Sequence, residues 1–513
     1  MTVSENPILL TDEELARVRP ITLSVIGPTN EGKTSVLRTL SGDPDFGEVN
    51  SLTGTTARAE YQKIFHRDQA EILRLVDTPG FQMSGAICER LETETSAGCK
   101  PGAAAILAAI PADDGDFRHD RRAWTEVAAS DIVIYIANAA ESPRQSLLRD
   151  TLELLFCVDR PVIVLFNNIT QEKTNAALGE KPNEAGEFFG EWTEALTRGG
   201  LHMFQVFDAH RRRFENEYAL FEKICALIHD PLSLKAIRAE LFERLRLEKL
   251  RMNRSRRIIA EMMLDIATLS ATAENVSAQT YKNDEENLRR QLGDLAAGRE
   301  HEAHRQLLEL WRFHVGILDR KRLSIENDLN ENDYLFGKKW KEHSLGGAKY
   351  GAIGGAAFGL LLDAATAGLS LGTGTAIGAL LGGALGGALG GCYNHVYDKR
   401  EKRITARIGR SVFAPLLARG VELTKQLQRR GQATADSIQL LLSAEPLKIA
   451  APEFFALLNE TSRETDWSAI CRDLSDLSEN DRRKRAERIA QLADTLEPVL
   501  RVSDEMTAYT DST

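Results

Sequence analysis

The chain has 513 residues, of which 27% are charged and 43% hydrophobic, and its formal net charge at pH 7 is -11. This length exceeds a single compact core and predicts roughly two to four domains. The acidic balance argues against a protein dominated by nucleic-acid binding, and the six scattered cysteines show no CxxC spacing, so we expect neither disulfides nor structural zinc.

The N-terminal stretch is polar and acidic and does not resemble a secretory signal, so any membrane contact is expected from inside the chain.

Between Ile21 and Phe207, short runs rich in Val and Ile alternate with helical patterns, which predicts an α/β domain with a mainly parallel sheet. The six predicted strands are ITLSVIG, EYQKIFH, EILRLVDT, DIVIYIANA, PVIVLFNN and MFQVFD. A helix over about 215–228 would end this domain near Pro231, beyond which the pattern is helical.

A phosphate-binding motif follows the first predicted strand. The sequence GPTNEGKT, Gly27 to Thr34, matches G-x-x-x-x-G-K-[ST] between that strand and a helical pattern. Backbone N–H groups of such a loop surround phosphates, Lys33 reaches the β and γ phosphates, and Thr34 ligates Mg²⁺. The other nucleotide contacts predicted here are Asn30, Glu31, Gly32 and Ser35. The alternative is a chance match in a glycine-containing turn.

A second motif, LRLVDTPG at residues 73 to 80, ends the third predicted strand. Its Asp77 is suited to holding Mg²⁺ through water, and the amide of Gly80 is suited to the γ-phosphate. The sequence GTT between the two motifs predicts a loop that closes over the nucleotide, with Thr56 as a Mg²⁺ ligand and Thr55 as the alternative. These threonines also fit a simple turn.

These motifs and their spacing resemble the Era and TrmE branch of bacterial TRAFAC GTPases over about the first 230 residues. The resemblance implies a GTPase that converts GTP to GDP and phosphate with Mg²⁺, with Lys33, Asn30, Thr56 and Gly80 as the catalytic set. Phe81 stands after the DTPG run and cannot hydrogen-bond the attacking water, so slow intrinsic turnover is expected, with neighbouring Gln82 as a weak substitute.

Two further positions follow from the same resemblance. Asn30 matches the asparagine that ligates K⁺ in cation-activated members, where the ion neutralises charge developing between the β and γ phosphates; alternatively it stabilises its own loop. The base-reading NKxD motif is replaced by NNIT, so guanine preference is inferred from the resemblance alone. Asn167, the first residue of NNIT, is still a predicted contact to the base. Asp208, in the sequence FDAH, is either a replacement acceptor for the base or a cap for the next helix.

The second half of the chain holds two unusual segments. Nine basic and three acidic residues lie between Lys235 and Arg257, which fits either binding to anionic lipid or RNA or a solvated helix face. Glycines recur every fourth residue from Gly347 to Gly359 and from Gly374 to Gly390, which predicts a tight glycine-zipper hairpin flanked by basic residues. This hairpin either enters a membrane or packs in a soluble bundle or oligomer.

The layout is also similar to a group of proteobacterial Era-like GTPases that carry an uncharacterised C-terminal domain with a glycine-rich apolar insert. We predict an α/β P-loop GTPase domain followed by an all-α domain with the glycine-zipper hairpin. The expected boundaries are a GTPase domain at 1–230, a helical arm at 231–345, the hairpin at 346–393 and a C-terminal helical region at 394–513.

The function predicted from these features is a GTP-binding and GTP-hydrolysing switch that couples nucleotide state to a membrane-associated helical domain. Its expected partners are GTP and GDP, a membrane lipid or membrane protein at 346–393, and a second copy of the chain. The expected place is the cytoplasm, at the inner membrane. Two alternatives remain: a soluble GTPase that assembles ribosomes or RNA, and a non-catalytic nucleotide-binding scaffold that oligomerises.

Overall fold

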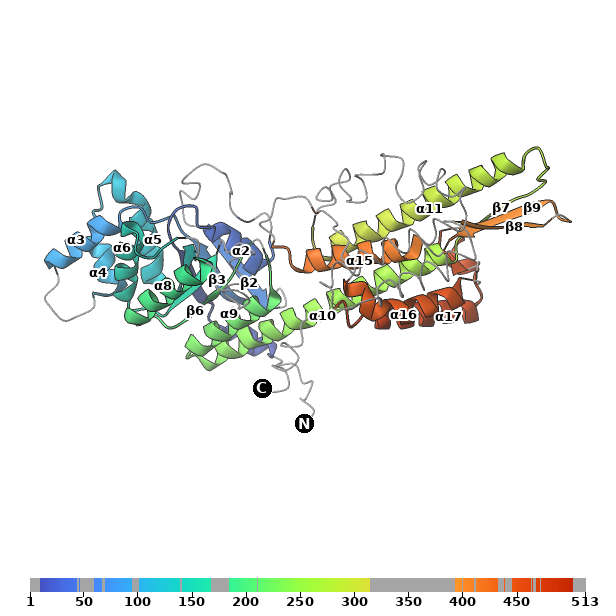
Figure 1. Ribbon diagram of the computed structural model, residues 1–513. Helices are drawn as coiled ribbons and strands as arrows, with labels where there is room; N and C mark the ends of the chain where they lie inside the picture. Colours follow the sequence, from blue (N-terminus) through green and yellow to red (C-terminus); the bar gives the residue numbers. More distant parts are fainter. Residues whose placement is uncertain are drawn as a thin grey trace. The chain divides into compact units, whose positions relative to one another are not determined.

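A computed structural model of the chain (Figure 1) describes residues 10–43, 46, 60–66, 70–94, 101–138, 141–167, 184–209, 211–313, 393–398, 400–409, 412–431, 438, 445–462, 464, 467–470 and 472–501. These residues form two compact units. The first extends to Leu247 and also holds residues 429–431. The second extends from Glu248 to Gln428 and continues from residue 438.

The first unit is built on a six-stranded sheet in the order β2-β3-β1-β4-β5-β6. Only the pair of β2 and β3 is antiparallel, so the sheet is mainly parallel and the six predicted strands are confirmed. The central strands are buried along their length, as expected for a parallel sheet with helices on both faces. The strands are β1 (Ile21–Ile26), β2 (Glu60–His66), β3 (Ala70–Asp77), β4 (Ile132–Asn138), β5 (Val162–Asn167) and β6 (Phe204–Val206).

Helices connect the parallel strands of this sheet, because a parallel pair requires a crossover. The helices of this unit are α1 (Asp12–Arg17), α2 (Lys33–Ser41), α3 (Ser84–Glu94), α4 (Gly102–Ala109), α5 (Arg118–Ala129), α6 (Ser146–Phe156), α8 (Glu184–Arg198) and α9 (Phe214–Leu227), with a short 3-10 helix, η1 (Gly115–Phe117). Helix α1 precedes β1 and α9 follows β6, so these two connect no strands. Helix α9 confirms the predicted helix before Pro231. The largest buried side chains of the unit include Trp124, Trp192 and Tyr135.

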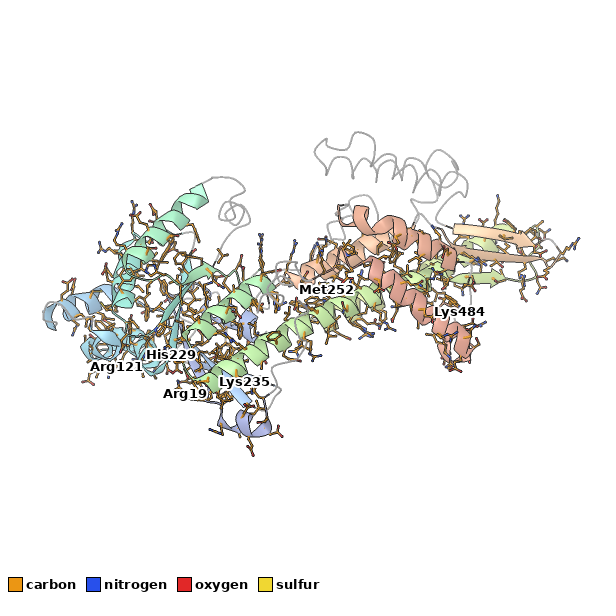
Figure 2. All side chains as sticks on the ribbon, turned by 90° about the horizontal axis from the view of Figure 1, so that it is seen from below. Arg19, Arg121, His229, Lys235, Met252 and Lys484 are labelled. Atoms are coloured by element: carbon orange, nitrogen blue, oxygen red, sulfur yellow. The ribbon has the colours of Figure 1, made fainter. Side chains whose placement is uncertain are left out.

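The long helix α10 (Pro231–Ala267) begins in the first unit and contains the boundary between the two. The start of α10 is held by two hydrogen bonds: Lys235 Nζ donates to Glu14 Oε1 of α1 at 2.6 Å, and Ser233 Oγ donates to Arg19 O, just after α1, at 2.9 Å. Arg19 and Lys235 are labelled in Figure 2. The basic segment 235–257 lies on α10, and six of its nine cations form ion pairs with carboxylates of the chain. Both interpretations of this segment stay open.

The second unit is largely helical, as predicted. Its elements after α10 are α11 (Tyr281–Leu310), α15 (Phe413–Gln428), α16 (Glu445–Thr461), η5 (Leu474–Asp476) and α17 (Glu479–Thr495). A small antiparallel sheet, in the order β7-β9-β8, was not among the predicted elements. Its strands are β7 (Ser270–Ala273), β8 (Tyr393–Asp398) and β9 (Arg403–Ile408).

The glycine-rich hairpin predicted at 346–393 lies outside the described residues, except that Tyr393 is the first residue of β8 instead of the end of a helix. Within the part of the chain that the structure describes, no helix combines the length and the apolar character needed to cross a membrane.

Asp265 joins three helices in the core of the second unit. Its carboxylate accepts hydrogen bonds from Arg299 Nε of α11 at 2.8 Å and from Arg485 Nη2 of α17 at 2.7 Å. The backbone N–H of Ala469 adds a third, at 3.1 Å. A buried carboxylate is tolerated only when it is paired in this way, so Asp265 fixes α10 against α11 and α17.

A second buried ionic group joins α11 and α15. Arg419 donates from Nε and Nη2 to the two carboxylate oxygens of Glu300 at 2.6 and 2.8 Å, a bidentate pair. One turn along α11, His304 Nε2 lies 3.9 Å from Glu300 Oε1. Burial, reinforced by the charge of Arg419, lowers the pKa of His304 from 6.5 to about 4 although Glu300 opposes the shift. His304 is therefore neutral near pH 7.

This shift predicts a pH-dependent stability. A lowered histidine pKa stabilises the fold fully above pH 6.5, and this contribution is lost as the pH falls toward 4, by at most about 1.4 kcal/mol per pH unit. Between pH 7 and pH 5, His304→Gln should therefore lose about 2 kcal/mol less stability than the wild type in urea unfolding. Exposed His301→Gln is the control on the same helix. Equal losses in wild type and His304→Gln would contradict this prediction.

Candidate nucleotide-binding site

The glycine-containing loop between β1 and α2 has the backbone conformation that its sequence requires. Gly32, at the N-cap of α2, has φ +83°, and Asn30 has φ +69°, a left-handed region that asparagine adopts more readily than most residues. A Cβ on Gly32 would lie 2.5 Å from Asn167 Nδ2, and a Cβ on Gly27 would lie 2.7 Å from Ile136 O. Side chains are therefore excluded at both glycines.

Lys33 is the first residue of α2 and is buried beneath this loop. Its Nζ donates to the carbonyl oxygens of Pro28 at 2.7 Å and Gly27 at 3.2 Å. Burial lowers the pKa of Lys33 to about 8, although the charges of Asp77 and Glu31 favour the ammonium form. A bound phosphate would give this desolvated cation an anionic partner, which neutral carbonyl groups do not provide.

Thr34 and Asp77 bring two oxygen ligands together beside Lys33. Thr34 Oγ1 donates to Asp77 Oδ2 at 2.5 Å, and Asp77 is fully buried at the end of β3. Burial raises its pKa from 3.8 to about 6, against the Thr34 hydrogen bond and the Lys33 charge. Among the described residues, Asp77 Oδ1 has no hydrogen-bond partner. A hydroxyl next to a buried carboxylate with an unused oxygen is a donor set that fits Mg²⁺.

The DTPG run lies directly against the glycine-containing loop. Phe81 N donates to Gly27 O at 3.2 Å, and Pro28 and Phe81 form an isolated parallel bridge. A Cβ on Gly80 would lie 2.6 Å from the backbone N and Cα of Thr29. Gly80 therefore lies beside the loop of Lys33, at a position where only glycine fits, and its contact with the γ-phosphate stays a prediction.

The side chain of Phe81 points into the core. It is 1% exposed, and its ring stacks on Trp124 of α5 with centroids 5.4 Å apart and planes 12° from parallel. One turn earlier on α5, Asp120 accepts hydrogen bonds from the backbone N–H groups of Gln82 at 3.1 Å and Met83 at 3.3 Å. Burial raises the pKa of Asp120. Sequence reasoning missed Asp120, which looks like an ordinary acidic residue in the first turn of a helix.

Because Phe81 is buried, a polar side chain at this position cannot gain access to a nucleotide without leaving the core. We expect Phe81→Gln to destabilise the protein by about 3 kcal/mol, through the lost ring packing and the buried amide, without faster GTP hydrolysis. Phe81→Leu, which stays apolar, should cost less than about 1.5 kcal/mol. Urea unfolding and a phosphate-release assay measure both effects, and a faster Phe81→Gln enzyme would refute the packing argument.

Asn167 connects the glycine-containing loop to the loop of Asp208 and Ala209, which is the predicted base loop. Its Nδ2 donates to Glu31 O at 2.9 Å, and its Oδ1 accepts from the backbone N–H of Ala209 at 3.0 Å. The side chain is fully buried. Asp208 is adjacent to Ala209 but does not cap α9, whose N-cap is Arg213 without a side-chain hydrogen bond. The capping alternative for Asp208 is therefore wrong, and its role toward a base stays a prediction.

The remaining predicted positions are less constrained. Thr55 and Thr56 lie outside the described residues. Asn30 is exposed and forms no hydrogen bond to another described residue, so its predicted K⁺ contact stays a prediction. Ser35 is buried in the first turn of α2, and the side chain of Gln82 is exposed. The structure thus gathers Lys33, Thr34, Asp77 and Gly80 around one loop, with Asn167 behind it.

Two family models match the chain. Residues 22–168 match the model described as "50S ribosome-binding GTPase", and residues 193–494 match the model described as "Domain of unknown function (DUF3482)". The predicted α/β P-loop GTPase domain, followed by a largely helical region, is thereby confirmed. The predicted base loop at Ala209 falls within the second match. No curated protein matches the chain.

Several solved structures are distantly similar. An Era protein in complex with MgGDPNP and nucleotides 1506–1542 of 16S ribosomal RNA has 16% identity over 42% of this chain, with a TM-score of 0.29. The match spans 58% of that Era chain, less than two thirds of its length. Era from Aquifex aeolicus bound to GDP and AlF4⁻ has 17% identity over 50% of this chain and 71% of its own, with a TM-score of 0.26. A probable GTP-binding protein engB has 18% identity over 40% of this chain and 97% of its own, with a TM-score of 0.24.

Proposed function

This chain belongs to the family described as a domain of unknown function, DUF3482, and from that premise we propose that its GTPase domain works as a switch that binds GTP and hydrolyses it to GDP and phosphate. One observation carries the proposal. The hydroxyl of Thr34 and the buried carboxylate of Asp77 meet beside Lys33, and Asp77 Oδ1 has no partner among the described residues.

These residues divide the work of binding a triphosphate. Thr34 and Asp77, with Thr56, would hold Mg²⁺, which when bound neutralises charge on the β and γ phosphates. Lys33 and the N–H groups of the loop hold the phosphate oxygens. The backbone of Gly80 senses the γ-phosphate, and water is the nucleophile.

Intrinsic GTP hydrolysis is slow unless another group or ion accelerates it. Phe81 is buried against Trp124 and has no group that orients water. Asn30 has an exposed side chain at the loop, which supports a role as a K⁺ ligand. If K⁺ occupies that place, it supplies positive charge near the β and γ phosphates and accelerates hydrolysis. Asn167 and Asp208 belong to the base side of the site, where guanine is the proposed base.

The finer part of the proposal concerns the output. The nucleotide state reorders the loops at Thr56 and Phe81, and the helical region carries this change to a membrane through the segment 346–393. The support is the four-residue glycine step with basic flanks. The protein is then cytoplasmic and associated with the inner membrane, and the same glycine pattern suits contact with a second copy.

A second candidate is a GTPase that acts on the ribosome. The matching GTPase model is described as ribosome-binding, and this name favours it. In this case, the full-length protein would sediment with ribosomal subunits in a GTP-dependent manner and would stay out of membrane fractions.

Fractionation of the full-length protein with and without GTP, combined with hydrolysis assays in K⁺ and in Na⁺, tests the proposal. We expect GTP hydrolysis that is faster in K⁺, and membrane association that is lost when residues 346–391 are deleted. Equal rates in both ions would remove the role given to Asn30. A deletion variant that remains in the membrane fraction would remove the role given to the glycine segment.

A further inference from the structure

A short segment from the second half of the sequence packs in the first unit, against the base loop. Residues 429–431 follow α15 directly and belong to the first unit. Arg430 and Arg211 form an isolated antiparallel bridge. A Cβ on Gly431 would lie 1.7 Å from Ala209 O and 2.8 Å from Ala209 C. This neighbour is backbone and cannot turn aside as a flexible side chain would.

Ala209 is also held by two hydrogen bonds to residues that contact or follow the nucleotide loop. Its carbonyl oxygen accepts from Thr39 Oγ1 of α2 at 3.0 Å, and its N–H donates to Asn167 Oδ1 at 3.0 Å. Asn167 in turn donates to Glu31 O at 2.9 Å. Ala209 and Asn167 are fully buried and Thr39 nearly so, so the base loop has little freedom to shift without breaking one of these bonds.

We propose that Gly431 is a positioning residue for base recognition. Because segment 429–431 packs closely against the loop at Ala209, it sets the position of this loop relative to the nucleotide base. The inference rests on the proposed GTP-binding function. The position of this loop is important because the sequence NNIT lacks the aspartate that reads guanine in the resembled GTPases. Selectivity for guanine then depends more on where the backbone of the loop at Ala209 lies. Recognition of a base by buried polar groups is sensitive to small displacements of those groups.

The test is Gly431→Ala in the full-length chain, assayed with GTP and with ITP, whose base lacks the exocyclic amine. The added methyl displaces the loop at Ala209, so we expect KM for GTP to rise about tenfold, kcat at saturating GTP to stay unchanged, and the preference for GTP over ITP to shrink. Gly298→Ala is the matched control, because a Cβ at exposed Gly298 meets nothing within 4 Å.

Thr39→Val is the second variant. It removes the hydroxyl that donates to Ala209 O, so KM and the preference for GTP should change in the same direction as in Gly431→Ala but by less. If Gly431→Ala does not fold, Thr39→Val alone tests whether the position of the loop at Ala209 controls base recognition. If the wild type takes up GTP but the folded variants keep its KM and its preference for GTP over ITP, the inference is wrong, even if their melting temperatures fall. A wild type that does not take up GTP overturns the proposed function itself.

Discussion

Replacing Lys33 with alanine should weaken GTP binding about 100-fold, because it removes a buried cation from the phosphate oxygens. The structure gives this residue no comparable role in the unliganded fold. Its Nζ contacts two neutral carbonyl oxygens, of Pro28 and Gly27, and burial lowers its pKa to about 8, so the charged amine opposes folding below that pH. The melting temperature without nucleotide should therefore not fall at pH 7, because the variant no longer buries a charged amine. Titration with a fluorescent GTP analogue measures the affinity.

The matched control for this variant is Lys235→Ala, a lysine whose ion pair with Glu14 lies at the surface of α10. It should bind GTP like the wild type, since surface ion pairs contribute about 0–1 kcal/mol to stability and this one is on α10, outside the nucleotide loop. An Lys33→Ala protein that binds GTP as tightly as the Lys235→Ala protein would show that the loop at Gly27 does not hold a triphosphate.

Asp77→Asn should separate function from stability. Burial raises the pKa of Asp77 from 3.8 to about 6, so its favourable contribution is complete below pH 3.8 and is lost as the pH rises through 6. At pH 7 the ionised carboxylate therefore costs up to about 3 kcal/mol, which asparagine avoids while still accepting the Thr34 hydrogen bond. Without nucleotide, we expect the variant to be more stable than the wild type. We also expect Mg²⁺ to have almost no effect on the affinity of the variant for GTP.

Urea unfolding without nucleotide and GTP titration with and without Mg²⁺ measure the two effects. Asp131→Asn is the comparison, because Asp131 is a partly exposed carboxylate that pairs with Arg19. It should gain no stability and keep the Mg²⁺ effect. An Asp77→Asn protein that is less stable than the wild type and still responds to Mg²⁺ would contradict the ligand role of Asp77.

The elements of the first unit could be predicted because their signals are local. Buried parallel strands such as Val162–Asn167 are continuous apolar runs, and the glycine-containing loop has a fixed spacing that ends at Thr34. The placement of Asp77 beside Thr34 follows from the parallel pairing of β1 and β3, whose carboxyl ends lie at one edge. A short motif and the order of the strands were therefore sufficient.

The features that were missed depend on contacts between residues far apart in the sequence. Strand Ser270–Ala273 pairs with Arg403–Ile408 across the glycine-rich insert, and its sequence SATA carries no strand signal of its own. Strand Arg403–Ile408 does alternate buried residues with more accessible ones, a period of two that was present in the sequence. The contacts of Asp120 and Gly431 are with backbone far away in the sequence, at Gln82 and Ala209, so no local pattern indicates them.

The central claim is that Lys33, Thr34 and Asp77 enclose a nucleoside triphosphate together with Mg²⁺. The most direct test is a titration of the purified full-length protein with a fluorescent GTP analogue, in millimolar Mg²⁺ and again with the metal chelated. The account predicts saturable binding that is stronger with Mg²⁺ and is displaced by GTP. Absence of binding under both conditions, or binding that Mg²⁺ does not change, would contradict it.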